Sequence, residues 1–356
     1  MGIHSGGGQN ISRFRHRFLP LSENGDGLGR ILTRETKLKK RSLLCSLILV
    51  ASAGILAAGN YSLVKKFPVN GVPKWDLLTV DEANRRLYLS HESEVAVFDV
   101  DSGASSGAIA NTPGVHGIAI APESGRGFTS NGQASTVTIF NLKTLAIISH
   151  VAVGKKPDAI IYDPATRRVF AMNGGSDSTT AIDSETGAVA GTVNLGGGPE
   201  YGAADGAGSV YVNLEDQSEV ARLDSRNLVV RDHWPLAPCA RPSSMAIDRA
   251  THRLFIGCRS RVMAVVSADT GKVISSLTIG DHVDATWFDP DTKLIFNSTG
   301  EGTVDVFHED SPDQYSAVQR IPTRAGAKTM ALDFKTHRLF VPANGSGQFE
   351  ILVFGY

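Results

Sequence analysis

Between residues 60 and 356 the chain alternates short apolar runs with polar turns, and the pattern recurs every 40 to 44 residues. Each unit opens with an apolar run that ends in a turn, usually at Asp, and continues with a basic residue, an aliphatic residue and an aromatic one. Residues 163–170 (Asp-Pro-Ala-Thr-Arg-Arg-Val-Phe) are the clearest copy. A third run, as in residues 137–141, and a fourth, as in residues 188–193, complete the unit. This alternation between turn-forming residues predicts four antiparallel β-strands per unit.

One position in each unit, five residues before the turn, gives a register for the whole repeat. Its seven residues, named the anchor residues below, are Asp76, His116, Asp158, Glu200, Ser243, Asp284 and Lys328. They are spaced by 40, 42, 42, 43, 41 and 44 residues. A four-stranded unit repeated at this spacing is the signature of a β-propeller. The predicted fold class is therefore all-β, a seven-bladed β-propeller with four antiparallel strands per blade.

The two ends of the repeat are predicted to complete one blade together. The last unit stops after its third strand, residues 349–354. Residues 61–73 match residues 145–157 in length and pattern, and those include a fourth strand. We therefore expect residues 61–70 to pair with the C-terminal strand. This N-terminal strand would close the ring and cover an otherwise exposed sheet edge.

Composition narrows the function classes without selecting one. The chain has 35 Lys and Arg against 36 Asp and Glu, and this balance argues against a generally basic nucleic-acid-binding protein. Arg259 and Arg261 would supply only a local basic patch. An apolar fraction of 42% is too high for a disordered protein and too low for a multi-span membrane protein. The 37 glycines are explained by the many turns of the repeat.

The first 59 residues are expected to form two further segments. Residues 1–41 are polar and basic, which predicts a disordered leader. Residues 42–59 are apolar and uncharged, as in a secretory signal peptide or an uncleaved membrane anchor. The basic residues before them place the N-terminus in the cytoplasm and the propeller, residues 60–356, outside. We expect a periplasmic or extracellular protein, with cleavage near Gly59 favoured because the closing strand follows directly.

Three stretches of the repeat carry a family resemblance. They are residues 156–164 (Lys-Pro-Asp-Ala-Ile-Ile-Tyr-Asp-Pro), 168–173 (Arg-Val-Phe-Ala-Met-Asn) and 198–202 (Gly-Pro-Glu-Tyr-Gly). They resemble the bacterial β-propellers built from YVTN-type repeats, and the resemblance covers residues 61–356. The tetrapeptide itself is replaced by versions such as Val-Phe-Ala-Met, so the copies are divergent. The resemblance implies the fold but no particular activity, because no activity is assigned to most members of that family.

The anchor residues are the candidate site, because the first strand of each propeller blade lines the central channel. They are expected to form a ring at the mouth that carries the loops between strands 2 and 3 and between strands 4 and 1. Four carboxylates converging there would repel one another unless a cation or fixed donors neutralise them. Lys328 and Arg241 are available for part of that role. His91 and His282 are further imidazoles expected near this mouth.

Two interpretations of the ring stay open. In the first, the mouth binds a small polar ligand or a divalent cation, with Asp158, Glu200, Asp284 and His116 as metal ligands. Carboxylate oxygens suit Ca²⁺, whereas Zn²⁺ requires nitrogen. In the second, the mouth is a hydrated polar vestibule whose side chains cap neighbouring backbone N–H groups. Propellers with lactonase or lyase activity bind metal at the corresponding mouth, which is an analogy at the level of the fold alone.

Cys239 and Cys258 are the candidate disulfide, since they flank the first strand of the fifth unit. Export would permit the bond, and three cysteines in the chain allow at most one. The two cysteines stand at positions of the repeat that are offset from each other, and this offset argues against a disulfide between them. The pairing therefore stays open at the level of the sequence.

The leading functional hypothesis is a non-enzymatic scaffold whose channel-mouth face binds a protein, a polymer or a small ligand. Short loops on a rigid scaffold suit recognition, and no local nucleophile–base arrangement is visible. The alternative is a metal-dependent, lactonase-like hydrolase or lyase with His116 as general base and the acidic anchors as ligands. Nucleic acid is disfavoured as a partner, and membrane contact is expected only through an uncleaved segment 42–59. We expect a monomer.

Overall fold

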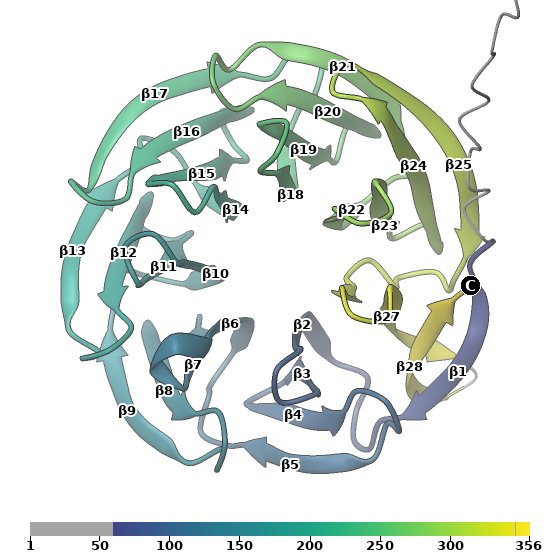
Figure 1. Cartoon of the computed structure of the whole chain (residues 1–356). Helices are drawn as coiled ribbons and strands as arrows, with labels where there is room; N and C mark the ends of the chain where they lie inside the picture. Colours follow the sequence, from purple (N-terminus) through teal and green to yellow (C-terminus); the bar gives the residue numbers. More distant parts are fainter. Residues whose placement is uncertain (1–59, 346) are drawn as a thin grey trace, which may run out of the picture. The chain divides into compact units, whose positions relative to one another are not determined.

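A computed structural model describes residues 60–345 and 347–356. Within them the chain forms 28 β-strands and one short 3₁₀-helix, η1 (Pro122–Ser124), and the strands make seven four-stranded antiparallel sheets. The sheets stand as blades around a central axis (Figure 1), so the predicted seven-bladed β-propeller is confirmed. The leader and apolar segment predicted for residues 1–41 and 42–59 lie outside the described residues. In the described part of the chain, no helix has the length and apolarity to cross a membrane.

Each blade runs from an inner strand beside the channel to an outer strand at the rim. Blades 1 to 3 are β2 (Trp75–Asp81), β3 (Arg86–His91), β4 (Glu94–Asp99), β5 (Ser105–Ile109); β6 (Val115–Ala121), β7 (Arg126–Asn131), β8 (Thr136–Asn141), β9 (Ile147–Ala152); and β10 (Pro157–Asp163), β11 (Arg168–Asn173), β12 (Ser178–Asp183), β13 (Val189–Asn194). Blades 4 and 5 are β14 (Pro199–Ala204), β15 (Ser209–Leu214), β16 (Glu219–Asp224), β17 (Val229–Pro235); and β18 (Pro242–Asp248), β19 (Arg253–Cys258), β20 (Val262–Ser267), β21 (Val273–Thr278). Blades 6 and 7 are β22 (Val283–Asp289), β23 (Leu294–Thr299), β24 (Thr303–Ser311), β25 (Gln314–Pro322); and β26 (Ala331–Asp333), β27 (Arg338–Gly345), β28 (Gln348–Gly355), β1 (Ser62–Pro68).

The N-terminal strand β1 completes blade 7, as the sequence predicts. It pairs antiparallel with β28, from Ser62 opposite Gly355 to Pro68 opposite Glu350. Phe67 fixes this strand because its ring is only 1% exposed and packs against Phe340, with ring centroids 6.0 Å apart. The first and last described strands are therefore held in one sheet by a buried side chain as well as by backbone hydrogen bonds.

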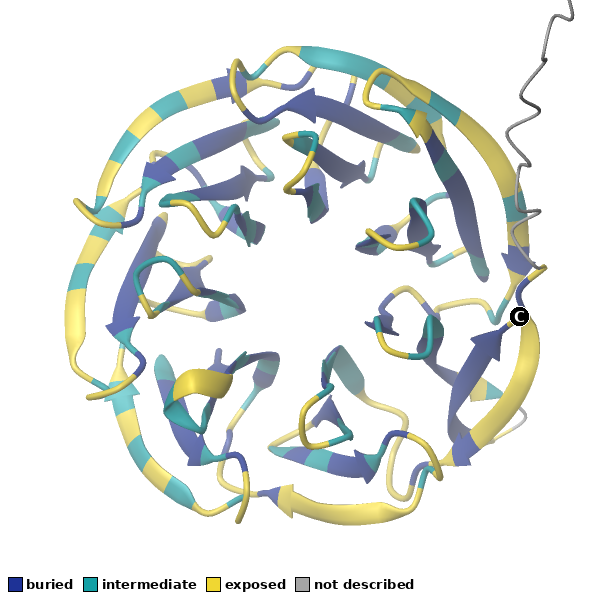
Figure 2. Ribbon diagram, in the orientation of Figure 1, coloured by how far each residue is buried: buried dark blue, intermediate teal, exposed yellow. Residues whose placement is uncertain are grey.

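The aromatic residue of the repeated turn motif builds the core between blades. Tyr88, Phe128, Phe170, Phe255, Phe296 and Phe340 are fully buried, and Tyr211 is 3% exposed. Each lies in the second strand of its blade. In Figure 2 the second and third strands of each blade are mostly buried, the inner strands mix buried and intermediate residues, and the outer strands carry most of the exposed ones. The apolar face of each sheet is thus covered by its neighbours, which is how a propeller buries its core.

The turn between the first two strands also supplies contacts between neighbouring blades. Four residues after the Asp that opens the turn stands a residue with positive φ. Examples are Arg85 (52°), Lys293 (58°) and His337 (55°). Its side chain reaches the turn-opening Asp of the blade before it. These pairs are Arg85–Asp333 (2.8 Å), Lys293–Asp248 (3.3 Å) and His337–Asp289 (2.6 Å). The first of them joins blade 1 to blade 7 across the closure of the ring.

Cys239 and Cys258 form a disulfide in the structure, with their Cα atoms 5.7 Å apart. This separation lies in the usual range for a disulfide. Both residues are buried, and the bond ties the connection before β18 to the end of β19. Although the two cysteines are offset in register, the loop that precedes β18 brings Cys239 to Cys258.

Candidate ligand site at the polar mouth of the channel

A β-bulge places the anchor residues at the channel in blades 1 to 6. At this position the inner strand has one more residue than its partner, as between Pro157 and Ile160 in β10 and between Val283 and Ala285 in β22. The same irregularity occurs in β2, β6, β14 and β18. A bulge re-aims a side chain and is frequent beside functional sites.

All seven anchor residues line one cavity of about 120 Å³, which we name the polar well. Beside it, over blades 1 to 3, lies a groove of about 690 Å³. The two share Asp76, His116 and Asp158. Lys155 and Lys156 are among the exposed residues that line this blade 1–3 groove. A ligand in the groove would therefore reach the channel axis through these three shared side chains.

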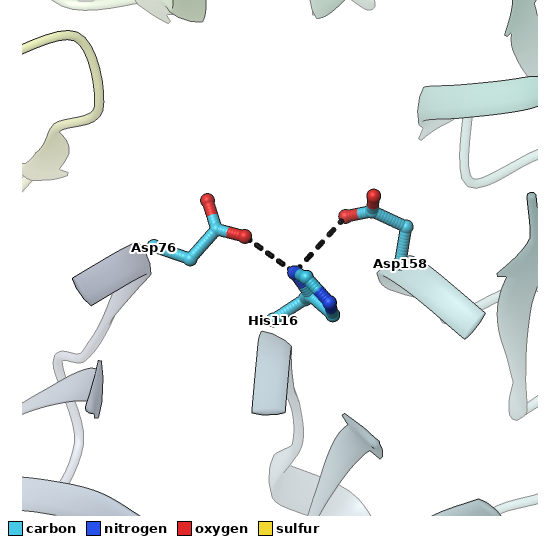
Figure 3. A group of neighbouring side chains, drawn as sticks. All are labelled: Asp76, His116 and Asp158. Carbon is cyan, nitrogen blue, oxygen red and sulfur yellow. Dashed lines mark hydrogen bonds and ion pairs between the residues drawn. The ribbon is translucent and has the colours of Figure 1, made fainter. Parts of the chain in front are cut away.

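The three shared residues form a compact acid–imidazole cluster (Figure 3). His116 Nδ1 lies 2.5 Å from Asp76 Oδ2 and 3.8 Å from Asp158 Oδ1. The hydrogen bond to Asp76 raises the pKa of His116, which favours the imidazolium. The side chain of Asp158 is 40% exposed to the channel, yet the protein that surrounds its carboxylate raises its pKa to about 6. The cluster thus holds two groups whose pKa values are raised, His116 by its hydrogen bond with Asp76 and Asp158 by burial.

A second group, on the opposite side of the well, is organised by Arg259. This residue follows β19, and its guanidinium lies 3.1 Å from Glu215 Oε1, 3.5 Å from Asp284 Oδ1 and 3.9 Å from Glu200 Oε1. Burial, reinforced by a hydrogen bond with Glu215, raises the pKa of Glu200, which favours a shared proton between the two carboxyl groups. Burial likewise raises the pKa of Asp284, and the Lys328 ammonium 2.5 Å away counteracts part of this increase.

The structure divides the four residues predicted as metal ligands into two groups. His116 and Asp158 lie together with Asp76, and one ligand atom from each of these three residues lies within 4.8 Å of the others. The other two predicted ligands are ion-paired with basic side chains. These pairs are Glu200–Arg259, Asp284–Arg259 and Asp284–Lys328. Repulsion among the anchors is therefore relieved largely by the protein's own cations, and within residues 60–345 and 347–356 only the Asp76–His116–Asp158 cluster has a geometry suited to a metal ion.

Other residues singled out in the sequence have different roles. Arg241 pairs with Glu215 at 2.8 Å, not with an anchor residue. His91 is buried, with Nε2 2.7 Å from the carbonyl oxygen of Val72. His282 has a 73% exposed side chain beside Asp281. Both histidines lie outside the set of residues that line the polar well.

One further sequence interpretation changes with the structure, and one short sequence motif has no catalytic role in it. Arg259 is not part of an exposed basic patch, because its side chain is 28% exposed and faces three carboxylates. Residues 103–107 match the Gly-x-Ser-x-Gly pattern, but Ser105 is exposed on the outer strand β5. A nucleophile elbow instead requires a strand-to-helix turn, so this match carries no catalytic meaning.

The channel narrows below the polar well. Tyr201 lines the well and also a cavity of about 10 Å³ at mid-channel, together with Leu77, Trp287 and Met330. A cavity of that size holds about one water molecule. The space below the polar well is therefore narrow, and a ligand larger than a water molecule would enter the well from its own mouth.

Comparisons with known proteins bear on the fold. No protein-family model matches the chain, and no curated protein matches it. Among solved structures, it is similar to a chain of the mitotic checkpoint complex (15% identity, TM-score 0.73, 92% of this chain and 99% of that chain). It is also similar to Kuenenia stuttgartiensis hydrazine synthase (15%, 0.69, 80% and 96%) and to U3-55K (8%, 0.72, 84% and 99%). Likeness at such identities establishes a shared β-propeller fold and leaves the function open.

Proposed function

We propose that this chain is an exported recognition scaffold and a divergent member of the YVTN-type propellers. It binds a polar ligand at the polar mouth, the end of the channel that contains the polar well. One observation carries the proposal: the blade 1–3 groove opens into the polar well through Asp76, His116 and Asp158. A concave site of about 690 Å³ with a few convergent polar groups is of the size and kind that proteins use for ligands.

The charges of the groove suggest what it binds. Its outer part carries three exposed lysines, Lys74, Lys155 and Lys156, against one exposed acid, Glu92, while its inner end carries Asp76 and Asp158 around an imidazole. Trp75, stacked on Phe349 with ring centroids 5.0 Å apart, adds an aromatic surface. This arrangement complements a polar small molecule, or a polar segment of a protein or polymer, whose anionic part stays outside and whose hydrogen-bond donors point inward.

The scaffold itself supports recognition of a protein partner. The loops of this mouth are short and stand on strands held by buried aromatic residues, which suits binding without rearrangement. One structural neighbour is a chain of the mitotic checkpoint complex, so the fold serves in a protein assembly there.

The test is affinity capture from the fraction that contains the native protein, with three forms of the full chain. They are the wild type, a groove variant (Lys155→Glu with Lys156→Glu) and a control (Arg226→Gln) on the opposite face. We expect a component that binds the wild type and the control and is lost from the groove variant. Retention of every captured component by the groove variant would exclude this mouth as the binding face.

A second candidate function is metal-dependent hydrolysis or lyase chemistry, and the Asp76–His116–Asp158 cluster is what favours it. Two carboxylates and an imidazole are ligands that Zn²⁺ and other borderline divalent ions accept. Elemental analysis of the purified chain, before and after chelation, tests this candidate. Stoichiometric metal that disappears in Asp76→Asn would support it. Absence of metal, together with no thermal shift on adding Zn²⁺ or Ca²⁺, would refute it.

Export is tested by the N-terminal sequence of the native protein. A start near residue 60 is expected if residues 42–59 are a cleaved signal, and a retained anchor would give a membrane-bound protein that starts earlier. An exported soluble form that begins within residues 1–41 would contradict both.

A further inference from the structure

The channel has a second cavity at its opposite mouth, where the turns between first and second strands lie. This cavity has a volume of about 530 Å³ and is lined by blades 3 to 7. Its lining is chemically unlike the polar well, because it consists mainly of apolar and aromatic side chains. Among them are Ile161, Tyr201, Ala203, Ala246, Trp287 and Phe334. We name it the apolar mouth pocket.

The pocket arises from a break in the repeat symmetry. Ala203, Ala246 and Trp287 occupy equivalent positions, since they lie opposite the core aromatics Tyr211, Phe255 and Phe296. Blades 4 and 5 carry alanine here, as blades 2 and 7 do with Ala119 and Ala331, whereas blade 6 carries tryptophan. The small side chains leave the volume empty, and the large one forms its wall. Such an asymmetric cavity is not needed to close a ring of seven similar blades.

The walls of the pocket offer flat apolar surface. Trp287 Nε1 donates a hydrogen bond to the carbonyl oxygen of Met330, so its one polar atom is satisfied. The ring of Phe334 meets that of Trp287 edge-on, with centroids 5.9 Å apart. Tyr201 and Trp287 also line the mid-channel cavity of about 10 Å³. Only a cavity of this small volume lies between the pocket and the polar well at these residues.

The charge available at the rim of the pocket is positive. Arg249 is exposed, and its Nε and Nη2 donate to the carbonyl oxygen of Ala204 at 3.2 and 3.0 Å. Among the described residues Arg249 has no carboxylate within ion-pair distance. The neighbouring Asp248 is buried and engaged by the Ala250 N–H, the Thr251 hydroxyl and Lys293. A guanidinium held in place and lacking a carboxylate partner is suited to bind an anionic group.

We propose that the apolar mouth pocket is a second ligand site, which takes a small organic acid with a flat apolar body and places its carboxylate on Arg249. Pockets of 300–1,000 Å³ with mainly apolar walls and few polar groups are typical of small-molecule sites. The site is independent of the proposed function at the polar mouth.

Isothermal titration of the purified full-length chain tests this site with three probes of one shape. They are 2-naphthoate, 2-naphthamide and 2-naphthylmethylammonium. We expect the carboxylate to bind tightest and the ammonium weakest. Arg249→Gln should weaken the carboxylate about tenfold, as expected for a charge-assisted hydrogen bond at a partly exposed site, and change the amide by less than about twofold.

Two controls and a filling variant complete the experiment. Arg226→Gln removes another exposed arginine of the same face, one that also donates to a backbone carbonyl, and should leave all three affinities unchanged. Asp158→Asn, at the polar mouth, should also leave them unchanged. Ala203→Trp should abolish binding of all three probes while circular dichroism shows a folded chain. Equal affinities for the acid and the ammonium, or an acid affinity that Arg249→Gln does not lower, would overturn the proposal even if Ala203→Trp fails to fold.

Discussion

Arg259 is predicted to hold the polar mouth together, and Arg259→Met is the variant that tests it. Its guanidinium lies within 3.9 Å of three carboxylates whose side chains are only 14–26% exposed. Two unit charges about 4 Å apart interact by about 4 kcal/mol at an effective dielectric of about 20. Removing one partner of a fully buried pair costs about 3–5 kcal/mol. Because these carboxylates are partly solvated and Lys328 still faces Asp284, we expect a loss of about 2–3 kcal/mol at pH 8.

Arg241→Met is the matched control, because Arg241 donates to the same Glu215 oxygen as Arg259. Its side chain is 62% exposed, however, against 28% for Arg259. Exposed ion pairs contribute about 0–1 kcal/mol, so this variant should lose less than about 1 kcal/mol. A comparison of the two variants therefore isolates the effect of burial from that of charge.

The assay is urea unfolding at pH 8 and at pH 4, followed by circular dichroism and tryptophan fluorescence together. The penalty of Arg259→Met should shrink at pH 4, because the carboxylates that stay ionised at pH 8, Glu215 and Asp284, then gain protons and repel each other less, whereas Glu200, with its pKa raised to about 9, already holds a proton at pH 8. Adding Glu215→Gln to Arg259→Met should recover part of the loss at pH 8, because Glu215, whose pKa is lowered, is the ionised member of its pair with Glu200. Equal penalties for Arg259→Met and Arg241→Met at pH 8, or a penalty that does not change with pH, would refute the reasoning.

The remaining predictions concern the acidic cluster, the ring closure and the disulfide. Burial raises the pKa of Asp158 from 3.8 to about 6, so this carboxyl group destabilises the fold progressively as pH rises through that interval. Asp158→Asn should therefore melt above the wild type at pH 8 and level with it at pH 3.5; the same difference at both pH values would contradict this. Phe67→Ala should cost about 3–5 kcal/mol in urea unfolding, and the exposed Leu63→Ala less than about 0.5 kcal/mol. Comparable losses would show that β1 is not fastened by its buried face. Cys258→Ala should cost about 3 kcal/mol, the loop-closure value for a separation of 19 residues, and dithiothreitol should then have no further effect. A variant as stable as the oxidised wild type would mean that the bond contributes nothing.

The blade architecture could be predicted from the sequence because its determinants are local. Each turn begins at an Asp or at the residue that replaces it, and the strand after the turn carries a buried aromatic residue. A single segment such as residues 163–170 therefore already specifies its own hairpin. The seven anchor positions followed from counting back from these turns, and the structure gathers all seven around the polar well. The pairing of β1 with β28 was predictable as well, since residues 61–73 resemble a fourth strand that has no partner next to it in the chain.

The partners of the anchor residues were not predictable in the same way. Arg259 is 44 residues from Glu215 and 59 from Glu200 in the chain, and the contact exists only because blades 4, 5 and 6 converge on one axis. In the sequence Arg259 and Arg261 looked like one basic patch. In the fold the first faces the well, whereas the second pairs with Glu301 at 2.9 Å. The direction of a side chain at the end of a strand decides between these outcomes.

The sequence alone thus determined the fold class, the number of blades, the closing strand and the positions that reach the channel, because period, turn chemistry and strand alternation act over a few residues. The tertiary structure decided which carboxylates are neutralised by Arg259 and Lys328 and which stay with His116. It also decided that Tyr201 and Trp287 narrow the channel between a polar well at one mouth and an apolar pocket at the other. These properties depend on distances across the ring and on the volumes of side chains from different blades, which no local pattern records.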